Sequence, residues 1–355
     1  MAEPRVLVIN PGSTSTRLAL FEGDRQTADE NIPSAPVEGA LIDALPSRLA
    51  DVTAFLERHG SPSLHAVVGR GGLLAPVASG TLRVDEPMLE DARRGARGEH
   101  PSNLGCLLAD AIAQRHEVSA FIVDPVSVDE LAPEARLTGI PEIVRESLAH
   151  ALNLHAAARW ACGERGVAYA ESGLVVAHLG GGFSIAAMRG GHITDVCNAN
   201  SGGPLSPTRA GMLPTQALIK LCFSGRYTLA DMKRLTTRDG GLRAHLGTDD
   251  AREVERRIAA GDEKARAVYD AMAYQTGKEI GAMAAALDGR VDAIVLTGGL
   301  AHSNRFCEAV TRRVSWIAPV LRRAGEFEMQ ALAAGALRVL RGEEPARCYR
   351  EGVTV

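Results

Sequence analysis

The chain has 355 residues, of which 46% are hydrophobic and 23% charged, so it can bury a sizeable core and is long enough for two domains. Its formal net charge of −4 and its 4% of aromatic residues, with no basic run interleaved with aromatics, argue against nucleic acid as a partner. The six scattered cysteines, the lack of a signal-peptide pattern and the lack of any apolar run near the roughly 18 residues of a membrane span predict a cytoplasmic protein with buried free thiols and no membrane contact.

Two short apolar runs near the start of the chain flank a polar turn. Residues 6–9 and 18–21 are rich in aliphatic and β-branched side chains, a pattern that predicts the two strands of a hairpin. The turn, NPGSTSTR over residues 10–17, offers an amide, several hydroxyls, a glycine and a cation. Such a loop suits a phosphate bound by backbone N–H groups and side-chain donors. On this segment alone, an ordinary Ser/Thr-rich hairpin turn is an equally good interpretation.

Strands and helices alternate along the rest of the first half. Residues 65–68 read as a strand that runs into a glycine-rich turn carrying Arg70, and residues 120–123 as a short buried strand that ends at Asp124. Helical periodicity predicts helices in four stretches: 37–58, which Pro46 should kink or divide; 86–97; a helix capped by Ser102 that ends at Arg115; and a long helix opened by Pro141 that ends at about Arg165.

The pattern then starts again. A strand over 174–178, a turn at Gly180–Gly182 and a second strand over 184–188 repeat the first hairpin at a separation of 168 residues, so that Gly12 falls on Gly180 and Asn10 on His178. Residues 65–72 similarly resemble residues 292–299. We interpret this as two halves that each begin with a strand–turn–strand hairpin, with one nucleotide-sized cleft between them. The alternative is that any two strand–glycine units look alike.

Helical periodicity dominates the second half. It predicts helices over 214–223, 229–235, 251–259, 262–287 and 328–341, the last of which should pack back onto the first half. Neither G-x-x-x-x-G-K-[ST] nor G-x-G-x-x-G occurs, so a phosphate-binding protein of this sequence needs a different device, which paired hairpin loops would supply.

Seven motifs in collinear order, spread over nearly the whole chain, closely resemble those of the acetate kinase family and, within it, the butyrate kinases. They are VINPGSTST (8–16), VGRGGLL (68–74), EHPSNL (99–104), FIVDP (121–125), HLGGG (178–182), PTRAG (207–211) and LTGGL (296–300). The resemblance implies an α/β fold of two duplicated actin-like ATPase (ribonuclease H-like) domains with a cleft between them, as in the actin, sugar-kinase and chaperone-ATPase superfamily. Residues 1–150 plus about 328–355 would form the N-terminal domain, and about 151–327 the C-terminal domain with the adenosine site.

The resemblance also implies a reaction: reversible transfer of the γ-phosphoryl group of ATP, with Mg²⁺, to a short-chain carboxylic acid such as butyrate, giving an acyl phosphate and ADP. A carboxylic acid is already ionised at neutral pH, so no general base is needed. Because an anion must approach a polyphosphate, catalysis should come from positioning and fixed cations. We also expect a homodimer or higher homo-oligomer.

Site residues carried over from the motifs fall into three groups. Arg70 and Arg209, in glycine-flanked loops, would grip the carboxylate or the phosphoryl group, His178 would hydrogen-bond the phosphoryl group, and Asp124 would orient that group or its metal. The metal shell would comprise Asn10, Asp124 and Glu328, with Glu326 as an alternative to Glu328. Nucleotide contacts would come from Asn10, Ser13, Ser15, Arg17, Gly180, Gly181, Gly182, Thr297, Gly298 and Gly299.

The sequence departs from the family pattern at several points, which puts the choice of substrate in question. Arg17 replaces a common lysine, Thr208 stands where glutamate is more usual, and residues 198–204 lack the expected acids. Acetate, propionate and branched acids differ from butyrate by methylenes worth only about 1–3 kcal/mol each, so the chain length is not predicted. The same fold would also suit a hydroxyl-directed sugar kinase or a non-catalytic nucleotide switch.

Overall fold

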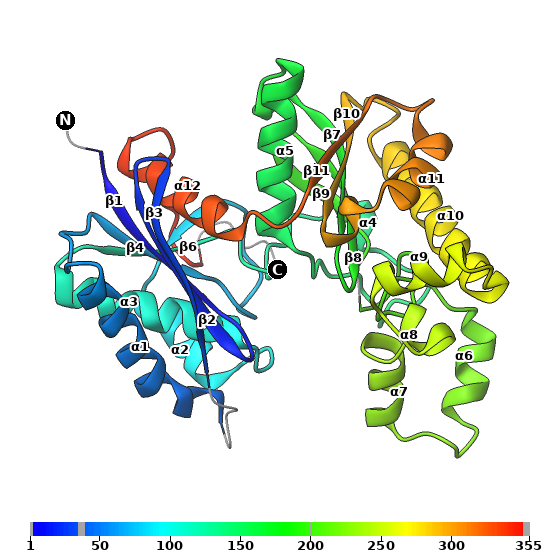
Figure 1. Cartoon of the computed structure of the whole chain (residues 1–355), viewed down its shortest axis with the longest axis horizontal. Helices are drawn as coiled ribbons and strands as arrows, with labels where there is room; N and C mark the ends of the chain where they lie inside the picture. The colour runs from blue at the N-terminus through cyan, green and yellow to red at the C-terminus, as the bar shows by residue number, and fades with distance from the viewer. Residues whose placement is uncertain (1–2, 35–39, 199, 351–355) are drawn as a thin grey trace. The chain divides into compact units, whose positions relative to one another are not determined.

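The computed structural model describes residues 3–34, 40–198 and 200–350 (Figure 1). The chain forms two compact units, which we call unit 1 (Met1–Asp129 and Phe327–Val355) and unit 2 (Glu130–Glu326). From the sequence, we expected these divisions after residues 150 and 327. In the part of the chain that the structure describes, no helix is long and apolar enough to cross a membrane.

Unit 1 is built on a six-stranded mixed sheet of order β3-β2-β1-β4-β6-β5. The predicted hairpin is confirmed, because β1 and β2 pair antiparallel with Asn10 opposite Arg17, and β4 and β6 continue the sheet in parallel. An edge strand, β3, was not predicted, because most of its side chains are polar and none is fully buried. The strands are β1 (Arg5–Pro11), β2 (Ser15–Glu22), β3 (Arg25–Pro33), β4 (Ala66–Arg70), β5 (Thr81–Arg83) and β6 (Ser119–Val123).

Helices cover both faces of this sheet (Figure 1). The helices α1 (Leu45–Arg58) and α3 (Leu104–His116) lie on one face and α12 (Glu328–Leu340) on the other, while α2 (Glu86–Arg94) packs beside α3. The prediction that the last helix packs onto the first half is therefore confirmed.

The helix predicted over 37–58 is divided next to Pro46, which was one of the two expectations for it. A 3₁₀ turn over Leu41–Ala44 ends where α1 begins, and Pro46 stands in the first turn of α1, where its missing N–H costs nothing. The predicted helix cap at Ser102 is wrong. Ser102 lies in a 3₁₀ turn over Pro101–Asn103, which precedes α3, and its own N–H donates to Nδ1 of His100 at 3.2 Å.

Unit 2 contains a five-stranded sheet of order β11-β10-β7-β8-β9. As in unit 1, the first two strands form an antiparallel hairpin, and the strand that opens it is flanked by a parallel neighbour, β10, which corresponds to β4. This shared pairing confirms the predicted duplication. The strands are β7 (Gly173–Leu179), β8 (Phe183–Arg189), β9 (His192–Val196), β10 (Ala293–Gly298) and β11 (Val320–Ala324).

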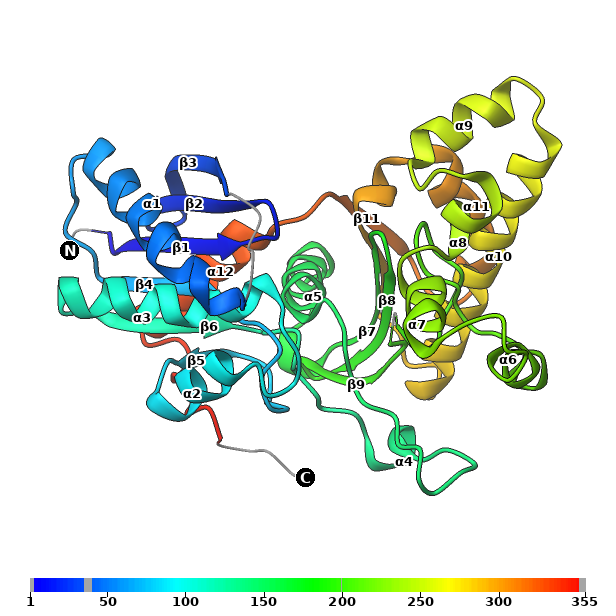
Figure 2. The same cartoon turned by 90° about the horizontal axis from the view of Figure 1, so that it is seen from below.

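Helix α5 lies on one face of this sheet and α10 and α11 on the other (Figures 1 and 2). The predicted helix over 251–259 is confirmed residue for residue, and the other helices predicted for this unit after residue 200 are confirmed to within two residues at each end. The helices of unit 2 are α4 (Pro133–Arg136), α5 (Ala151–Arg165), α6 (Thr215–Cys222), α7 (Leu229–Thr237), α8 (Gly241–Leu246), α9 (Ala251–Ala259), α10 (Glu263–Ala286) and α11 (Asn304–Val314).

The helix predicted from Pro141 is wrong in its first ten residues, because α5 begins only at Ala151. Before it, the guanidinium of Arg145 donates to the carbonyl of Ala135 (2.6 Å), to Asp195 Oδ1 (2.7 Å) and to the carbonyl of Val196 (3.0 Å). These contacts tie the segment to the end of β9 and override its helical periodicity.

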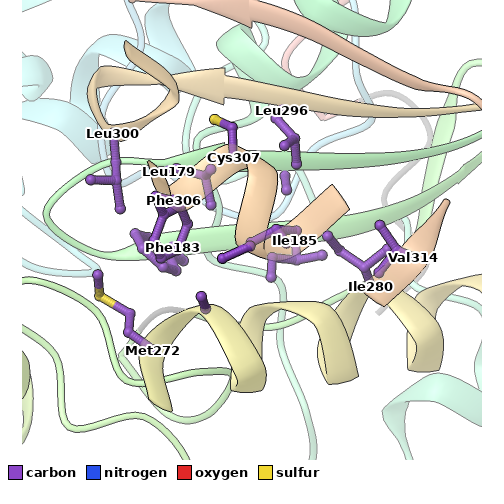
Figure 3. Packing of buried hydrophobic residues seen from close by; sticks show 14 of the residues in the cluster. Leu179, Phe183, Ile185, Met272, Ile280, Leu296, Leu300, Phe306, Cys307 and Val314 are labelled. Atoms are coloured by element: carbon purple, nitrogen blue, oxygen red, sulfur yellow. The ribbon is translucent and has the colours of Figure 1, made fainter. Parts of the chain in front are cut away.

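The core of unit 2 lies between the sheet and the α10–α11 pair (Figure 3). The ring of Phe306 packs edge-on against Phe183, with centroids 6.0 Å apart, and against Tyr269 at 5.6 Å. Tyr274 of α10 lies outside this core and is 53% exposed. The prediction of buried thiols holds for four cysteines but is wrong for Cys222 and Cys348, which are exposed.

Candidate functional site

Three of the predicted site residues of unit 1 lie at one edge of its sheet. Asn10 is near the end of β1, Arg70 ends β4 and Asp124 directly follows β6. Because β1, β4 and β6 are parallel neighbours, their carboxyl ends meet at the same edge, which is where α/β sheets bind ligands.

Glu328, the first residue of α12, joins two of these residues. Its Oε2 accepts a hydrogen bond from Asn10 Nδ2 at 2.5 Å, and its Oε1 forms an ion pair with Nη1 of Arg70. The side chains of Arg70 and Glu328 are only 15% and 14% exposed. Glu326, the alternative considered from the sequence, lies in unit 2 instead and lines the cavity described below. The structure thus groups Glu328, and not Glu326, with Asn10 and Arg70.

Asp124 is held in an unusual backbone conformation. Its φ is +39°, in the left-handed region that few residues other than glycine adopt, and its side chain is buried. Its Oδ1 accepts from the N–H of Gly80 at 2.6 Å, and its own N–H donates to the Gly80 carbonyl at 3.0 Å. One carboxylate oxygen of Asp124 therefore fixes the segment that leads into β5.

The loop after Arg70 is clamped by a residue that the sequence analysis quoted only within a motif. Asn103 accepts through Oδ1 from the N–H of Leu73 at 2.7 Å and donates through Nδ2 to the Gly98 carbonyl at 2.9 Å. A side chain at position 72 would overlap with Asn103, which explains why Gly72 stands there.

The turn between β1 and β2 is tight, and its predicted cation is already paired. The N–H of Gly12 donates to the carbonyl of Ser15 at 2.8 Å, and Ser13 is exposed at the tip. Arg17 makes a two-pronged ion pair with Asp29 of β3, with distances of 2.9 and 2.6 Å. This hydrogen-bonded pairing raises the pKa of Arg17. The charge of Arg17 is thus largely balanced by Asp29, which belongs to a strand that was not predicted.

In unit 2, His178 near the end of β7 is buried beside two residues of the α5 region. The amide Nδ2 of Asn153 lies 2.7 Å from His178 Nδ1, and the ring of His150 is 4.4 Å away between centroids. If the amide nitrogen of Asn153 donates in this contact, Nδ1 accepts and a neutral His178 carries its proton on Nε2. That nitrogen faces the glycine turn, since a Cβ built on Gly180 would lie 3.1 Å from it.

Arg209 is placed beside the same turn by its neighbours. Thr208 Oγ1 and Ser206 Oγ both donate to the carbonyl of Gly181, at 3.0 and 2.9 Å, and Arg209 Nη1 donates to Thr208 Oγ1 at 3.2 Å. Within the residues that the structure describes, no carboxylate pairs with Arg209, and its Nε has no partner. Burial, followed by the nearby charge of Arg238, lowers the pKa of Arg209. An unbalanced, half-buried guanidinium is suited to an anionic ligand.

A cavity of about 660 Å³ opens next to these loops, wholly within unit 2. Gly180, Gly181 and Gly299, three of the predicted nucleotide contacts, line it, together with Asp250 at the start of α9. The sequence analysis missed Asp250, although its place before a predicted helix marks it as a cap, and its Oδ1 indeed accepts from the N–H of Arg252 at 2.9 Å.

Three other predicted nucleotide contacts, Gly182, Thr297 and Gly298, do not line the cavity. Thr297 is buried and donates to the Gly325 carbonyl at 3.3 Å. Gly298 has a φ of +89°, and a Cβ there would lie 2.8 Å from the backbone of Leu179. These two residues shape the end of β10 where it passes β7.

No group of three His, Cys, Asp or Glu side chains that could hold a metal occurs among residues 3–34, 40–198 and 200–350. Magnesium in kinases needs fewer protein ligands, because one or two carboxylates, substrate phosphates and water complete its shell. The Glu328 carboxylate fits this use, because it is an oxygen ligand at the same edge of the sheet as Asn10 and Asp124.

Comparisons with known proteins agree with this architecture. Residues 157–317 match the model of the family described as the acetokinase family. "Probable butyrate kinase 2" of Caldanaerobacter subterraneus subsp. tengcongensis is 48% identical over 352 residues, which cover 97% of this chain and 99% of that protein. Two solved structures share the fold. The acetate kinase of Porphyromonas gingivalis has a TM-score of 0.79 at 20% identity, covering 95% of this chain and 100% of its own. A propionate kinase of Francisella tularensis subsp. tularensis has a TM-score of 0.74 at 16% identity, covering 94% and 98%.

The likeness to the Caldanaerobacter protein extends over almost the full length of both chains, and the fold is that of the two kinases of known structure. The chain therefore belongs to the acetokinase family.

Proposed function

We propose that this protein is a carboxylate kinase that transfers the γ-phosphoryl group of ATP reversibly to butyrate, giving butyryl phosphate and ADP. The observation that carries the proposal is the half-buried Arg209, a guanidinium with no carboxylate partner in the described part of the chain. It donates to Thr208, which is hydrogen-bonded to the glycine turn that lines the cavity of unit 2. The 48% identity to a probable butyrate kinase supports butyrate as the acid.

The cavity of unit 2 is the proposed adenosine site. Its volume of about 660 Å³ is within the range of small-molecule pockets, and the glycines that line it allow ligand atoms to approach the backbone N–H groups closely. The turn of unit 1, with Asn10, Ser13 and Ser15, is proposed to bind phosphate.

The proposed phosphoryl transfer requires no proton transfer. A carboxylate oxygen of butyrate attacks the γ-phosphorus, the bond from that phosphorus to the β,γ-bridging oxygen breaks, and ADP leaves with the electron pair. The acid is ionised at neutral pH and needs no base. Arg70 and Arg209 hold anionic oxygens with fixed guanidinium groups, and Nε2–H of His178 donates to the phosphoryl group.

Magnesium, when bound with ATP, neutralises charge on the polyphosphate. We propose that Glu328, Asn10 and the remaining oxygen of Asp124 hold it, chiefly through water. Removal of Mg²⁺ with a chelator should abolish the transfer while leaving the fold intact.

We also propose that the protein is a homodimer. The segment around α6 exposes five large apolar side chains, more than a monomer usually leaves to water in one place. They are Met212, Leu213, Ile219, Phe223 and Leu229. A Phe223→Asp variant should shift the mass measured by analytical ultracentrifugation toward the monomer, whereas a Trp316→Asp variant, which changes an exposed aromatic outside this segment, should not. A cytoplasmic location is proposed because all six cysteines are free.

The proposal is tested by trapping acyl phosphate with hydroxylamine in reactions that contain Mg-ATP and butyrate, glucose or no acceptor. Only butyrate should give the hydroxamate. Arg70→Ala and Arg209→Ala should each remove most of it, and their matched controls are Arg94→Ala and Arg189→Ala, which change exposed arginines of the same units. Phosphorylation of glucose, or ATP hydrolysis independent of an acceptor, would overturn the proposal.

A further inference from the structure

Arg48 of α1 is an arginine with almost no contact with water. It is 1% exposed and is the largest fully buried side chain of the described residues. Arginine is rarely buried in this way unless it is paired, because removing a guanidinium from water is costly. The partners of Arg48 therefore need an explanation.

All of these partners belong to the turn between β1 and β2. Nη2 of Arg48 donates to the carbonyl of Gly12 at 2.9 Å, while Nη1 donates to Thr16 Oγ1 at 2.9 Å and to the carbonyl of Ser15 at 3.3 Å. One guanidinium thus holds both arms of the turn. Within the described chain no carboxylate is hydrogen-bonded to it, and its Nε has no partner.

These hydrogen bonds determine the direction in which the N–H of Ser13 points. In a planar trans peptide, the C=O and the N–H of the same unit point in opposite directions. Because the Gly12 carbonyl points at Arg48, the N–H of Ser13 in that peptide points away from it. Arg48 thus binds the carbonyls of Gly12 and Ser15 on one side of the turn, and the N–H of Ser13 points to the opposite side.

Arg48 also places a positive charge next to the turn. Burial lowers the pKa of Arg48, and Asp51, one turn further along α1, opposes this only from a distance. Arginine nevertheless stays protonated in proteins, so a positive charge persists directly behind the turn. Arg17, the cation expected for phosphate from the sequence, is instead paired with Asp29. The unbalanced cation next to the turn is Arg48.

We propose that Arg48 is a positioning residue for the polyphosphate of ATP: it fixes the turn Gly12–Thr16 so that the N–H of Ser13 points away from Arg48, and it supplies the buried positive charge that a bound phosphate balances. The inference rests on the proposed phosphate role of this turn. It differs from a merely structural brace in one respect, because a brace would affect stability and not the affinity for nucleotide.

The test compares Arg48→Met with Arg58→Met, which changes an exposed arginine of the same helix that pairs with Glu30. Kinetics are measured well below the unfolding temperature of each variant, and Mg-ATP binding is measured separately by calorimetry. Arg48→Met should raise KM and Kd for Mg-ATP by about tenfold or more, with KM for butyrate changed by less than about twofold. Arg48→Lys should restore part of the affinity because it keeps the charge, and Arg58→Met should match the wild type.

If Arg48→Met does not fold, Thr16→Val replaces it. This change keeps the shape of a fully buried side chain and removes one acceptor of Arg48. It should weaken Mg-ATP binding about two- to fivefold. A lowered melting temperature with unchanged Kd for Mg-ATP in these variants would overturn the inference. Because binding is measured without turnover, a wild type that binds Mg-ATP but forms no acyl phosphate would overturn the proposed function alone.

Discussion

Glu328→Gln is the substitution for which the structure gives the most specific expectation. The carboxylate of Glu328 pairs with Arg70 and accepts from Asn10, and both members of the ion pair are about 15% exposed. Glutamine keeps the size and one acceptor oxygen, so the hydrogen bond from Asn10 can persist. The charge that orients the Arg70 guanidinium is lost.

The magnitude follows from the pairing. A hydrogen bond to a charged group contributes about 1.5–3 kcal/mol and a neutral one about 1 kcal/mol, so the exchange should destabilise the protein by about 1–2 kcal/mol. For a unit of this size, that lowers its melting temperature by about 3–6 °C. The effect on kcat should be larger, about 10²-fold, because a small displacement of a positioning group has a steep effect on rate.

The matched control is Glu326→Gln, two residues earlier, which removes the same charge from an exposed side chain lining the cavity of unit 2. At saturating Mg-ATP, where a change in nucleotide affinity has no effect on the rate, it should leave kcat within about threefold and stability within about 0.5 kcal/mol. Calorimetry and steady-state kinetics on both variants decide the matter. A larger loss of kcat in Glu326→Gln than in Glu328→Gln, or an unchanged Glu328→Gln enzyme, would refute the assignment of Glu328.

Three further predictions concern single contacts. Asn153→Leu removes the contact with Nδ1 of His178 and should lower kcat about tenfold with little change in KM for ATP. Steady-state kinetics measure both constants, and a tenfold rise in KM for ATP would argue against this role of Asn153. Gly72→Ala places a methyl group against Asn103 and should destabilise unit 1 by more than about 2 kcal/mol in urea unfolding, whereas Gly139→Ala, with no atom within 4 Å of the new Cβ, should stay within about 0.5 kcal/mol. Asp29→Asn removes a carboxyl whose pKa is lowered by its hydrogen bond from Arg17. That carboxyl stabilises the folded state above its unfolded pKa of about 4, and this stabilisation is lost as the pH falls through its lower folded pKa. On acidification below about pH 4, the variant should therefore lose less stability than the wild type.

Features set by local sequence were predicted well. The hairpin around residues 10–17 follows from two apolar runs and turn chemistry, and the boundaries of α9 follow from regular periodicity. The duplication was visible because glycines and apolar strands recur at a fixed spacing, which the matching strand pairings of the two sheets reproduce.

Features set by contacts distant in the sequence were not predictable. The choice between Glu326 and Glu328 depends on contacts with Arg70, 258 positions away. The start of α5 depends on the contacts that Arg145 makes with β9, and the pairing of Arg17 with Asp29 depends on an edge strand whose polar sequence carries no burial signal. Arg48 occurs on a helix with several polar residues, and nothing in its local pattern distinguishes a buried arginine from an exposed one.

Attack of a carboxylate oxygen on the γ-phosphorus of ATP can be followed with butyrate labelled with ¹⁸O in both carboxylate oxygens. The reaction with unlabelled Mg-ATP is followed by ³¹P nuclear magnetic resonance. We expect an acyl phosphate whose phosphorus signal shows the isotope shift of one bridging ¹⁸O and which appears in step with ADP. Turnover of ATP without ¹⁸O bonded to phosphorus would contradict attack by the carboxylate.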